Sequence, residues 1–433
     1  MKRPQIFSLS NVYNDHIVVT LKIGFIVDKT ESFADCVHKL VETISYGGKG
    51  EFGSERPFAR EEYQVKIIQF QEDLPISENG NEITGRIQIA IPIKLCPINQ
   101  GIPQILSVIM YASVYSFISE FQVTDIALPD AYLKHLPQPK YGTAIFPGDE
   151  NELRIGLILK PRSILNAAIA NELIGKAVYA GIDYITDDEL TVDPSEWRFK
   201  ERVKFITNLL ANLENETGRK VKYIANISSS FENSMKFAMI ADQYGADGVM
   251  VNTVTMGYDV VQALAKNKKF KRFIVANVIG RNLMAGGPKY LITSHILSFF
   301  ARISGADAVY TGPFVGSVNT RHEKASHFTW ALTESLSSKY PIKKSFAVMS
   351  GGLAPNNLLE NYRIYSSPVM FSIGLSLCNL IEEGTSIEKV IEIIKTVFEA
   401  EKKGGAKQVE KEITELARKH VDYFKILNKL KWT

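Results

Sequence analysis

Several polar residues directly follow short apolar segments in the second part of the chain, and their types could support proton transfer next to a carbonyl group. Lys160 ends the largely apolar segment 154–160 and is followed by Pro161 and Arg162. A lysine at the end of a buried strand is partly desolvated, which lowers its pKa and lets it carry a proton or balance an enolate or phosphate. An isolated lysine would more often be a solvated rim residue, but Arg162 and the carboxylates nearby favour function.

Three consecutive carboxylates, Asp187, Asp188 and Glu189, follow the next apolar segment, which contains Tyr184. Successive residues that leave a strand point to opposite sides, so one or two of these side chains should reach the same site as Lys160. Hard oxygen ligands of this kind suit Mg²⁺. The alternative is a helix start, because acidic side chains stabilise helix N-termini. The residues by themselves leave both interpretations open.

Two glycine-bearing turns follow the last two apolar segments and favour a phosphate site. They are Ser350-Gly351-Gly352 and Ser372-Ile373-Gly374. Glycines let backbone N–H groups approach an anion closely, whereas the alternative is ordinary turn chemistry. A third segment, Gly312 to Ser317, has glycines spaced for a loop that closes over a site, or it is an ordinary surface loop.

Strict alternation of short apolar strands with longer helix-period segments would position these residues. The predicted strands are Arg154 to Lys160, Tyr184 with its neighbours, Val221 to Ile227, Gly248 to Asn252, Phe273 to Val278, Ala308 to Thr311, Phe346 to Ser350 and Val369 to Ile373. Eight βα units in about 250 residues are typical of a closed (β/α)₈ barrel, whose chemistry lies at the C-terminal ends of the strands. An open doubly wound sheet is the alternative, but it usually needs fewer units.

A smaller α+β domain of the ferredoxin-like kind is predicted in residues 1–140, and the barrel domain in residues 141–433. The expected elements of the smaller domain are strands Ile17 to Val27, Tyr63 to Phe70, Ile83 to Leu95 and a short one near Ile126, with helices Ser32 to Ser45 and Pro103 to Phe121. This β-α-β-β-α-β order predicts a sheet with helices packed against it.

Composition restricts the class of protein. The chain has 433 residues, of which 45% are hydrophobic and 22% charged, as in globular proteins, and its formal charge of +3 is far below the basic excess of a nucleic-acid binder. Its three cysteines are scattered and suggest neither a disulfide framework nor a zinc site. No segment approaches the about 20 apolar residues of a membrane span, and the first residues lack the apolar core of a signal peptide. We expect a cytoplasmic protein that binds a small anionic molecule, with no nucleic-acid or membrane partner.

This arrangement resembles the catalytic domain of the RuBisCO large subunit. Lys160-Pro161-Arg162 is similar to the family's Lys-Pro-Lys, and residues 181–189 are similar to its Gly-Gly-Leu-Asp-Phe-Thr-Lys-Asp-Asp-Glu run. The segment 312–316 and Ser350-Gly351-Gly352 match as well, and the likeness spans about 150–400. The resemblance implies a homodimer, or an assembly of dimers, whose active site borrows the smaller domain of the neighbouring subunit.

Departures from the family pattern argue against carboxylation. Thr186 stands where the family has the lysine that becomes a carbamate and bridges to Mg²⁺, so no carbamylated lysine is expected, although Asp188 and Glu189 match the two remaining metal ligands. Other replacements are Gly280-Arg281 for a His-Arg pair, Tyr310 for a histidine and Ser317 for the lid lysine. Losing a metal ligand and a lid cation would each cost orders of magnitude in rate.

The resemblance therefore implies a RuBisCO-like protein that forms an enediolate from a small, phosphorylated, ketose-like substrate, as an isomerase or lyase. Lys160 would be the base or proton carrier, with Arg162 and Arg281 as counter-charges. Asp188 and Glu189 would hold Mg²⁺ weakly, and Asp187 is a candidate to turn inward in place of the carbamate. The predicted anion site consists of Ser350, Gly351, Gly352, Ser372 and Gly374. The alternatives are a non-catalytic anion-binding homologue and, behind it, residual ribulose-bisphosphate carboxylase activity.

Overall fold

The computed structural model describes residues 14–28, 30–47, 61–73, 81–163, 165–317, 324–365 and 368–431. The chain forms two compact units. The first consists of Met1–Pro137, Gly280–Ser304 and Ser335–Ile342, and the second of Gln138–Ile279, Gly305–Glu334 and Lys343–Thr433. Two later segments, 280–304 and 335–342, thus belong to the first unit, whereas the predicted boundary at residue 140 assigns them to the barrel domain. The boundary stays a prediction about which parts of the chain fold independently.

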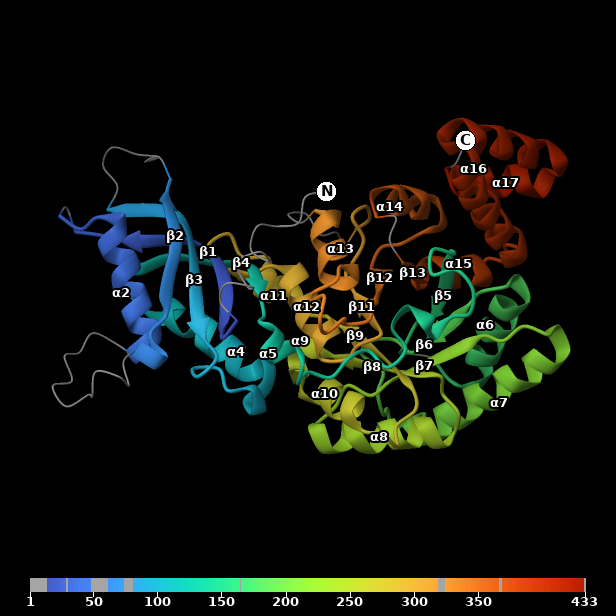
Figure 1. Cartoon of the computed structure of the whole chain (residues 1–433). Helices are drawn as coiled ribbons and strands as arrows, with labels where there is room; N and C mark the ends of the chain where they lie inside the picture. The colour runs from blue at the N-terminus through green and yellow to red at the C-terminus, as the bar shows by residue number, and fades with distance from the viewer. Residues whose placement is uncertain are drawn as a thin grey trace. The chain divides into compact units, whose positions relative to one another are not determined.

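The first unit contains a five-stranded mixed sheet in the order β10-β4-β1-β3-β2 (Figure 1). β1 pairs with β3 and β4 in the antiparallel sense, and β10 pairs with β4 in the parallel sense. The strands are β1 (His16–Ile26), β2 (Lys66–Glu72), β3 (Glu82–Pro92), β4 (Ile118–Ala127) and β10 (Tyr290–Ile292). The helices are α2 (Phe33–Tyr46), α4 (Gly101–Met110), α5 (Asp130–Leu133), α11 (Arg281–Ala285) and α12 (Ser294–Ile303). Apart from β10, this is the predicted α+β order.

The predicted helix from Pro103 to Phe121 was too long. α4 ends at Met110, a 3₁₀ turn follows at Tyr111–Val114, and β4 already begins at Ile118. Aromatic and β-branched residues between positions 114 and 123 favour an extended strand. Pairing with β1 then decides the outcome, because tertiary contacts outweigh local helix propensity.

The second unit contains a closed barrel in the strand order β11-β12-β13-β5-β6-β7-β8-β9, with every pair parallel. The strands are β5 (Arg154–Ile158), β6 (Tyr184–Thr186), β7 (Lys222–Asn226), β8 (Gly248–Asn252), β9 (Phe273–Asn277), β11 (Ala308–Tyr310), β12 (Phe346–Ser350) and β13 (Val369–Ile373). The predicted (β/α)₈ barrel is confirmed, and the open sheet is excluded because the strands close on themselves.

Helices cover the outside of the barrel (Figure 1). The helices of this unit are α6 (Ala167–Ala180), α7 (Phe199–Thr217), α8 (Phe231–Gln243), α9 (Thr253–Met256), α10 (Asp259–Lys266), α13 (Ala325–Thr333), α14 (Leu358–Ile364), α15 (Leu375–Glu382), α16 (Ile387–Lys419) and α17 (Val421–Lys429). α17 packs against α16 rather than on the barrel. α6 shows why such helices begin and end where they do: Asn166 caps its first amides, and Gly181, with φ of 86°, ends it in the left-handed region. No helix among the described residues has the length and apolar character needed to cross a membrane.

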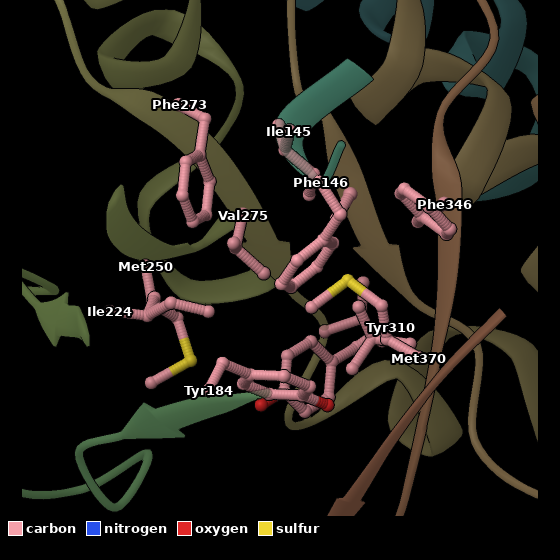
Figure 2. Packing of buried hydrophobic residues seen from close by; sticks show 13 residues of the cluster. Ile145, Phe146, Tyr184, Ile224, Met250, Phe273, Val275, Tyr310, Phe346 and Met370 are labelled. Carbon is pink, nitrogen blue, oxygen red and sulfur yellow. The ribbon is translucent and has the colours of Figure 1, made fainter. Parts of the chain in front are cut away.

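Buried side chains fill the barrel interior (Figure 2). Ile145 and Phe146, from the segment that precedes β5, pack among residues of the strands. Asp307 ties this segment to the barrel, because its carboxylate accepts the N–H groups of Tyr141 and Gly142 at 2.7 Å each and that of Ile274 at 2.8 Å. Desolvation outweighs these bonds and raises the pKa of Asp307 to about 6. The interior is therefore a packed core, and chemistry is confined to the strand ends.

Candidate active site

Lys160, Asp188 and Glu189 lie together at the carboxyl ends of the adjacent strands β5 and β6. The register of these strands pairs Ile158 with Thr186, two residues before Lys160 and Asp188 respectively. Lys160 Nζ lies 2.6 Å from Asp188 Oδ2 and 3.5 Å from Glu189 Oε2. The side chains of Asp188 and Glu189 are 2% and 14% exposed, and that of Lys160 is 27% exposed. We call this end of the barrel the mouth, and it brings together three residues that the sequence predicted to act together.

The prediction that burial lowers the pKa of Lys160 was wrong. Desolvation is the largest single influence and does lower this pKa. However, the hydrogen bond to Asp188 and the negative charges of Glu189 and Asp188 together outweigh it, so the pKa lies above its ordinary value. Lys160 is therefore a cation in the free protein, which can donate a proton or balance an anion but has no lone pair with which to accept a proton.

Arg162 and Arg281 were predicted as counter-charges. Arg162 Nη1 lies 3.8 Å from Asp188 Oδ1, and the Arg162 side chain is half exposed, so it borders the mouth and can reach a ligand there. Arg281 begins α11 in the first unit and is buried. The counter-charge role of Arg281 stays a prediction.

Asp187 is buried in a bonded network and does not replace the missing carbamate. Its Oδ1 accepts hydrogen bonds from Arg202 Nε at 3.2 Å and from the Tyr223 hydroxyl at 2.9 Å. Its Oδ2 accepts hydrogen bonds from Arg202 Nη2 at 3.2 Å and from the backbone nitrogen of Asn226 at 3.0 Å. The side chains of Asp187 and Arg202 are both 0% exposed. Four donors thus hold this carboxylate beneath the mouth, as a buried charge requires.

Asn226 positions the backbone that carries the two remaining carboxylates. Its side-chain nitrogen donates to the carbonyl oxygens of Asp188 and Glu189 at 3.2 and 2.7 Å. The amide of Leu190 also donates to Asp188 Oδ1 at 2.8 Å. The sequence placed Asn226 at a strand end without this role and missed Arg202 altogether. A polar residue within the apolar face of α7 was the signal, because Arg202 lies on the same helix face as Phe199 and other buried residues.

The oxygen atoms around Lys160 do not fit a ready-made Mg²⁺ site. Mg²⁺ requires near-octahedral oxygen ligands, yet Asp188 bonds the Lys160 ammonium and the Leu190 amide, and Glu189 faces the same ammonium. The hydroxyl of Thr186 donates to the Asp187 carbonyl at 3.2 Å and brings no charge. Across the described parts of the chain, no three His, Cys, Asp or Glu side chains are grouped to hold a metal ion.

The predicted glycine turns line the mouth but differ in role. Gly351 and Gly352 have φ of 101° and 69°, which only glycine adopts readily. A Cβ on Gly352 would lie 2.1 Å from Ser317 Oγ, so the segment after β11 packs directly on this turn. A Cβ on Gly374 would lie 3.1 Å from Lys160 Cε, so this glycine makes room for the lysine side chain.

Ser372 faces the barrel interior rather than an anion in the mouth. It is 1% exposed, and its hydroxyl lies 2.7 Å from that of Tyr184. Tyr310, which replaces a histidine of the family pattern, shares this hydroxyl network, since it interacts with Ser372 and Thr186. Burial raises the pKa of Tyr310 above its ordinary value and keeps the phenol neutral. Figure 2 shows both tyrosines in the interior cluster. Ser350, the neighbour of Ser372 across the strands, ends β12 at the mouth.

Asn361 of α14 anchors the segment that was predicted to close over the site. Asn361 Oδ1 accepts the amides of Phe314 and Val315 at 2.8 and 3.0 Å, and its Nδ2 donates to the Val315 carbonyl at 2.8 Å. The Phe314 ring stacks on Tyr365 with centroids 6.2 Å apart. Asn361 is fully buried, so these bonds are made away from water. Sequence reasoning missed this residue, because its partners are 46 and 47 positions away.

Comparison with known proteins gives a consistent family. The model of the ribulose bisphosphate carboxylase large chain, catalytic domain, matches residues 140–375. A 2,3-diketo-5-methylthiopentyl-1-phosphate enolase of Geobacillus thermodenitrificans is 26% identical over 67% of this chain and 70% of its own length. A ribulose bisphosphate carboxylase of Pyrococcus furiosus is also 26% identical, over 66% of this chain and 69% of its own.

Solved structures share the fold over nearly the whole chain. An octameric RuBisCO from Pyrococcus horikoshii has a TM-score of 0.81 at 20% identity and covers 97% of this chain and 94% of its own. A rubisco-like protein from Alicyclobacillus acidocaldarius has a TM-score of 0.79 at 19% identity, over 96% of this chain and 99% of its own. At these identities the likeness shows the fold alone.

Proposed function

The chain belongs to the family of the ribulose bisphosphate carboxylase large chain, and on that premise we propose that it is an enzyme that forms an enediolate from a small, phosphorylated, ketose-like substrate. One observation carries this proposal: the Lys160 ammonium lies at the barrel mouth in contact with Asp188 and Glu189. A cation beside a carboxylate is what abstraction of a proton next to a carbonyl requires, since one stabilises the oxyanion and the other takes the proton. An enolase among the relatives supports this reaction class.

The proposed step moves one proton to the protein and one from it. Glu189, whose contact with Lys160 is the longer of the two, removes the proton from the carbon next to the substrate carbonyl. The electrons of that C–H bond form the carbon–carbon double bond, and the carbonyl π electrons move to oxygen. The Lys160 ammonium stabilises this oxygen and gives it a proton, which yields a neutral enediol. Isomerisation is complete when Glu189 returns its proton to the former carbonyl carbon and the now neutral Lys160 amine takes the hydroxyl proton from the other enediol carbon, whose oxygen becomes the new carbonyl.

The remaining mouth residues would bind the phosphate of the substrate. The backbone N–H groups of the glycine pair Gly351 and Gly352, with Ser350 before them, can approach an anion closely, and Arg162 adds a positive charge at the rim. Gly374 acts through Lys160, whose side chain it accommodates.

Carboxylation is not part of the proposal. Thr186 has no amine that could become a carbamate, and Ser317 cannot supply the positive charge of a lid lysine. We propose a cytoplasmic homodimer or assembly of dimers. The names of structural relatives support assembly, since they describe a dimeric RuBisCO from Hyperthermus butylicus and an octameric one from Pyrococcus horikoshii.

Proton exchange in D₂O tests the proposed function. A panel of phosphorylated ketoses is first screened for binding by calorimetry, and loss of the α-proton signal of each bound compound is then followed by NMR. We expect exchange with the wild type and a fall in rate of about 10²-fold or more in Glu189→Gln. Glu172→Gln, which alters an exposed carboxylate on α6, is the matched control and should exchange at the wild-type rate.

Two outcomes would contradict the proposal. Binding of ketose phosphates without any exchange would identify a non-catalytic anion-binding homologue. Incorporation of ¹⁴CO₂ with ribulose bisphosphate would identify a residual carboxylase, and we predict none.

A further inference from the structure

The Lys160 ammonium lies between the two carboxylates that the family pattern assigns to a metal ion. Its nitrogen is 2.6 Å from Asp188 Oδ2 and 3.5 Å from Glu189 Oε2. Both carboxylates are largely buried, so each needs a positive partner. The Lys160 ammonium contacts both carboxylates at once and therefore supplies the positive charge that a bound metal cation would otherwise supply.

The surrounding residues are built to keep the lysine in this position. Gly374 leaves the space that the Lys160 stem occupies, since a Cβ there would lie 3.1 and 3.2 Å from Lys160 Cε and Cδ. Asn226 holds the backbone carbonyls of residues 188 and 189, and the Leu190 amide fixes the second oxygen of Asp188. The ion pair is therefore set by contacts from the ends of β6, β7 and β13 rather than by one flexible side chain.

Among the residues that the structure describes, the groups next to this pair provide no third charged ligand for a metal. Thr186 is neutral and 1% exposed. Asp187 accepts hydrogen bonds from Arg202, Tyr223 and the backbone N–H of Asn226. Turning Asp187 toward the mouth would leave the buried Arg202 guanidinium without its negative partner. Arg162 adds a second positive group within 3.8 Å of Asp188. Two carboxylates thus face two cations of the protein itself.

We propose that Lys160 is the built-in cation of this site and takes the place of a divalent metal ion between Asp188 and Glu189. The wild-type mouth then binds its anionic ligand without Mg²⁺. A direct consequence is that removing the ammonium leaves two carboxylates with only the half-exposed Arg162 as a nearby counter-charge and turns the mouth into a site for divalent cations. The loss of one charge therefore produces a gain of binding, which a merely structural lysine would not give.

Binding of Mn²⁺, a stand-in for Mg²⁺ that is visible by electron paramagnetic resonance, tests this proposal. We expect Lys160→Met to bind one Mn²⁺ at least about tenfold more tightly than the wild type, because a unit charge within about 4 Å of the cation is removed. The double variant Lys160→Met/Asp188→Asn should lose the gained site. Lys176→Met is the matched control, since Lys176 pairs with Glu172 at 2.7 Å on the exposed surface of α6.

Equal Mn²⁺ affinity in wild type and Lys160→Met would overturn the proposal, and so would a folded Lys160→Met that gains no site. Lys160→Gln is a second neutral variant that still donates a hydrogen bond to Asp188, and it should gain the same site if Lys160→Met does not fold. The readout is cation binding in the absence of substrate, so its result is separable from that of the proton-exchange experiment.

Discussion

Replacing Asp187 with asparagine tests the buried network beneath the mouth. The change keeps the shape of the side chain and removes its charge. Each carboxylate oxygen now accepts two hydrogen bonds, one from the Arg202 guanidinium and one from another donor. An asparagine has one oxygen, which accepts hydrogen bonds, and one NH₂ group, which only donates them. Whichever way the amide turns, two of the four present donors would therefore point at the NH₂ group and lose their acceptor.

The expected cost follows from the burial of the pair. Both side chains are 0% exposed, so Asp187→Asn leaves the Arg202 charge uncompensated and away from water. Removing one partner of such a pair costs about 3–5 kcal/mol of the free energy of unfolding. A solvent-exposed pair costs far less, and Glu172→Gln, which breaks the Lys176–Glu172 pair on α6, should cost no more than about 0.5 kcal/mol.

Urea denaturation followed by circular dichroism measures both variants under the same conditions. We expect a clearly lower midpoint for Asp187→Asn and an unchanged midpoint for Glu172→Gln. If the two variants unfold at the same urea concentration, Asp187 is not held by a buried network and is free to turn toward the mouth.

Three further predictions concern the segment after β11 and the base of the barrel. Asn361→Leu leaves the amides of residues 314–315 without an acceptor, which should cost about 2–5 kcal/mol and speed hydrogen exchange there; unchanged exchange would contradict the anchor. Gly352→Ala should destabilise the protein and displace Ser317, since φ is 69° and the added Cβ would lie 2.1 Å from Ser317 Oγ; an unaltered crystal structure of the variant would refute this. Burial raises the pKa of Asp307 from 3.8 to about 6, so the Asp307 carboxylate binds a proton more tightly in the folded protein than in the unfolded chain. Wild-type stability relative to Asp307→Asn should therefore fall by about 2 kcal/mol as pH rises from about 4 to 6, and a difference independent of pH would contradict the shift.

The sequence predicted the barrel and the grouping of Lys160 with two carboxylates because both follow from local patterns. Short apolar strands at regular spacing specify the barrel, and the C-terminal ends of its parallel strands must meet. The three-residue strand β10 was missed, because so short a segment is stabilised only by its pairing with β4, more than 160 positions earlier in the chain.

The direction of the pKa shift of Lys160 could not be read from the sequence. Burial alone lowers a lysine pKa, and only the positions of Asp188 and Glu189 relative to the ammonium reverse the sign. The sequence also could not show whether the Asp187 side chain points into the mouth or away from it, because its partner Arg202 lies on a helix 15 positions later. Strand ends show which residues gather at a site, whereas side-chain pairing decides which of them face a ligand.

Exchange of the substrate α-proton with D₂O in the presence of EDTA tests whether Lys160, and not Mg²⁺, supplies the positive charge of the site. We expect a ketose phosphate that binds the wild type to lose its α-proton signal at the same rate with EDTA as with added Mg²⁺. We also expect exchange by Lys160→Met, in EDTA, to be at least about 10²-fold slower. Exchange that begins only when Mg²⁺ is added to the wild type would mean that the site needs a divalent metal ion and that Lys160 does not replace it.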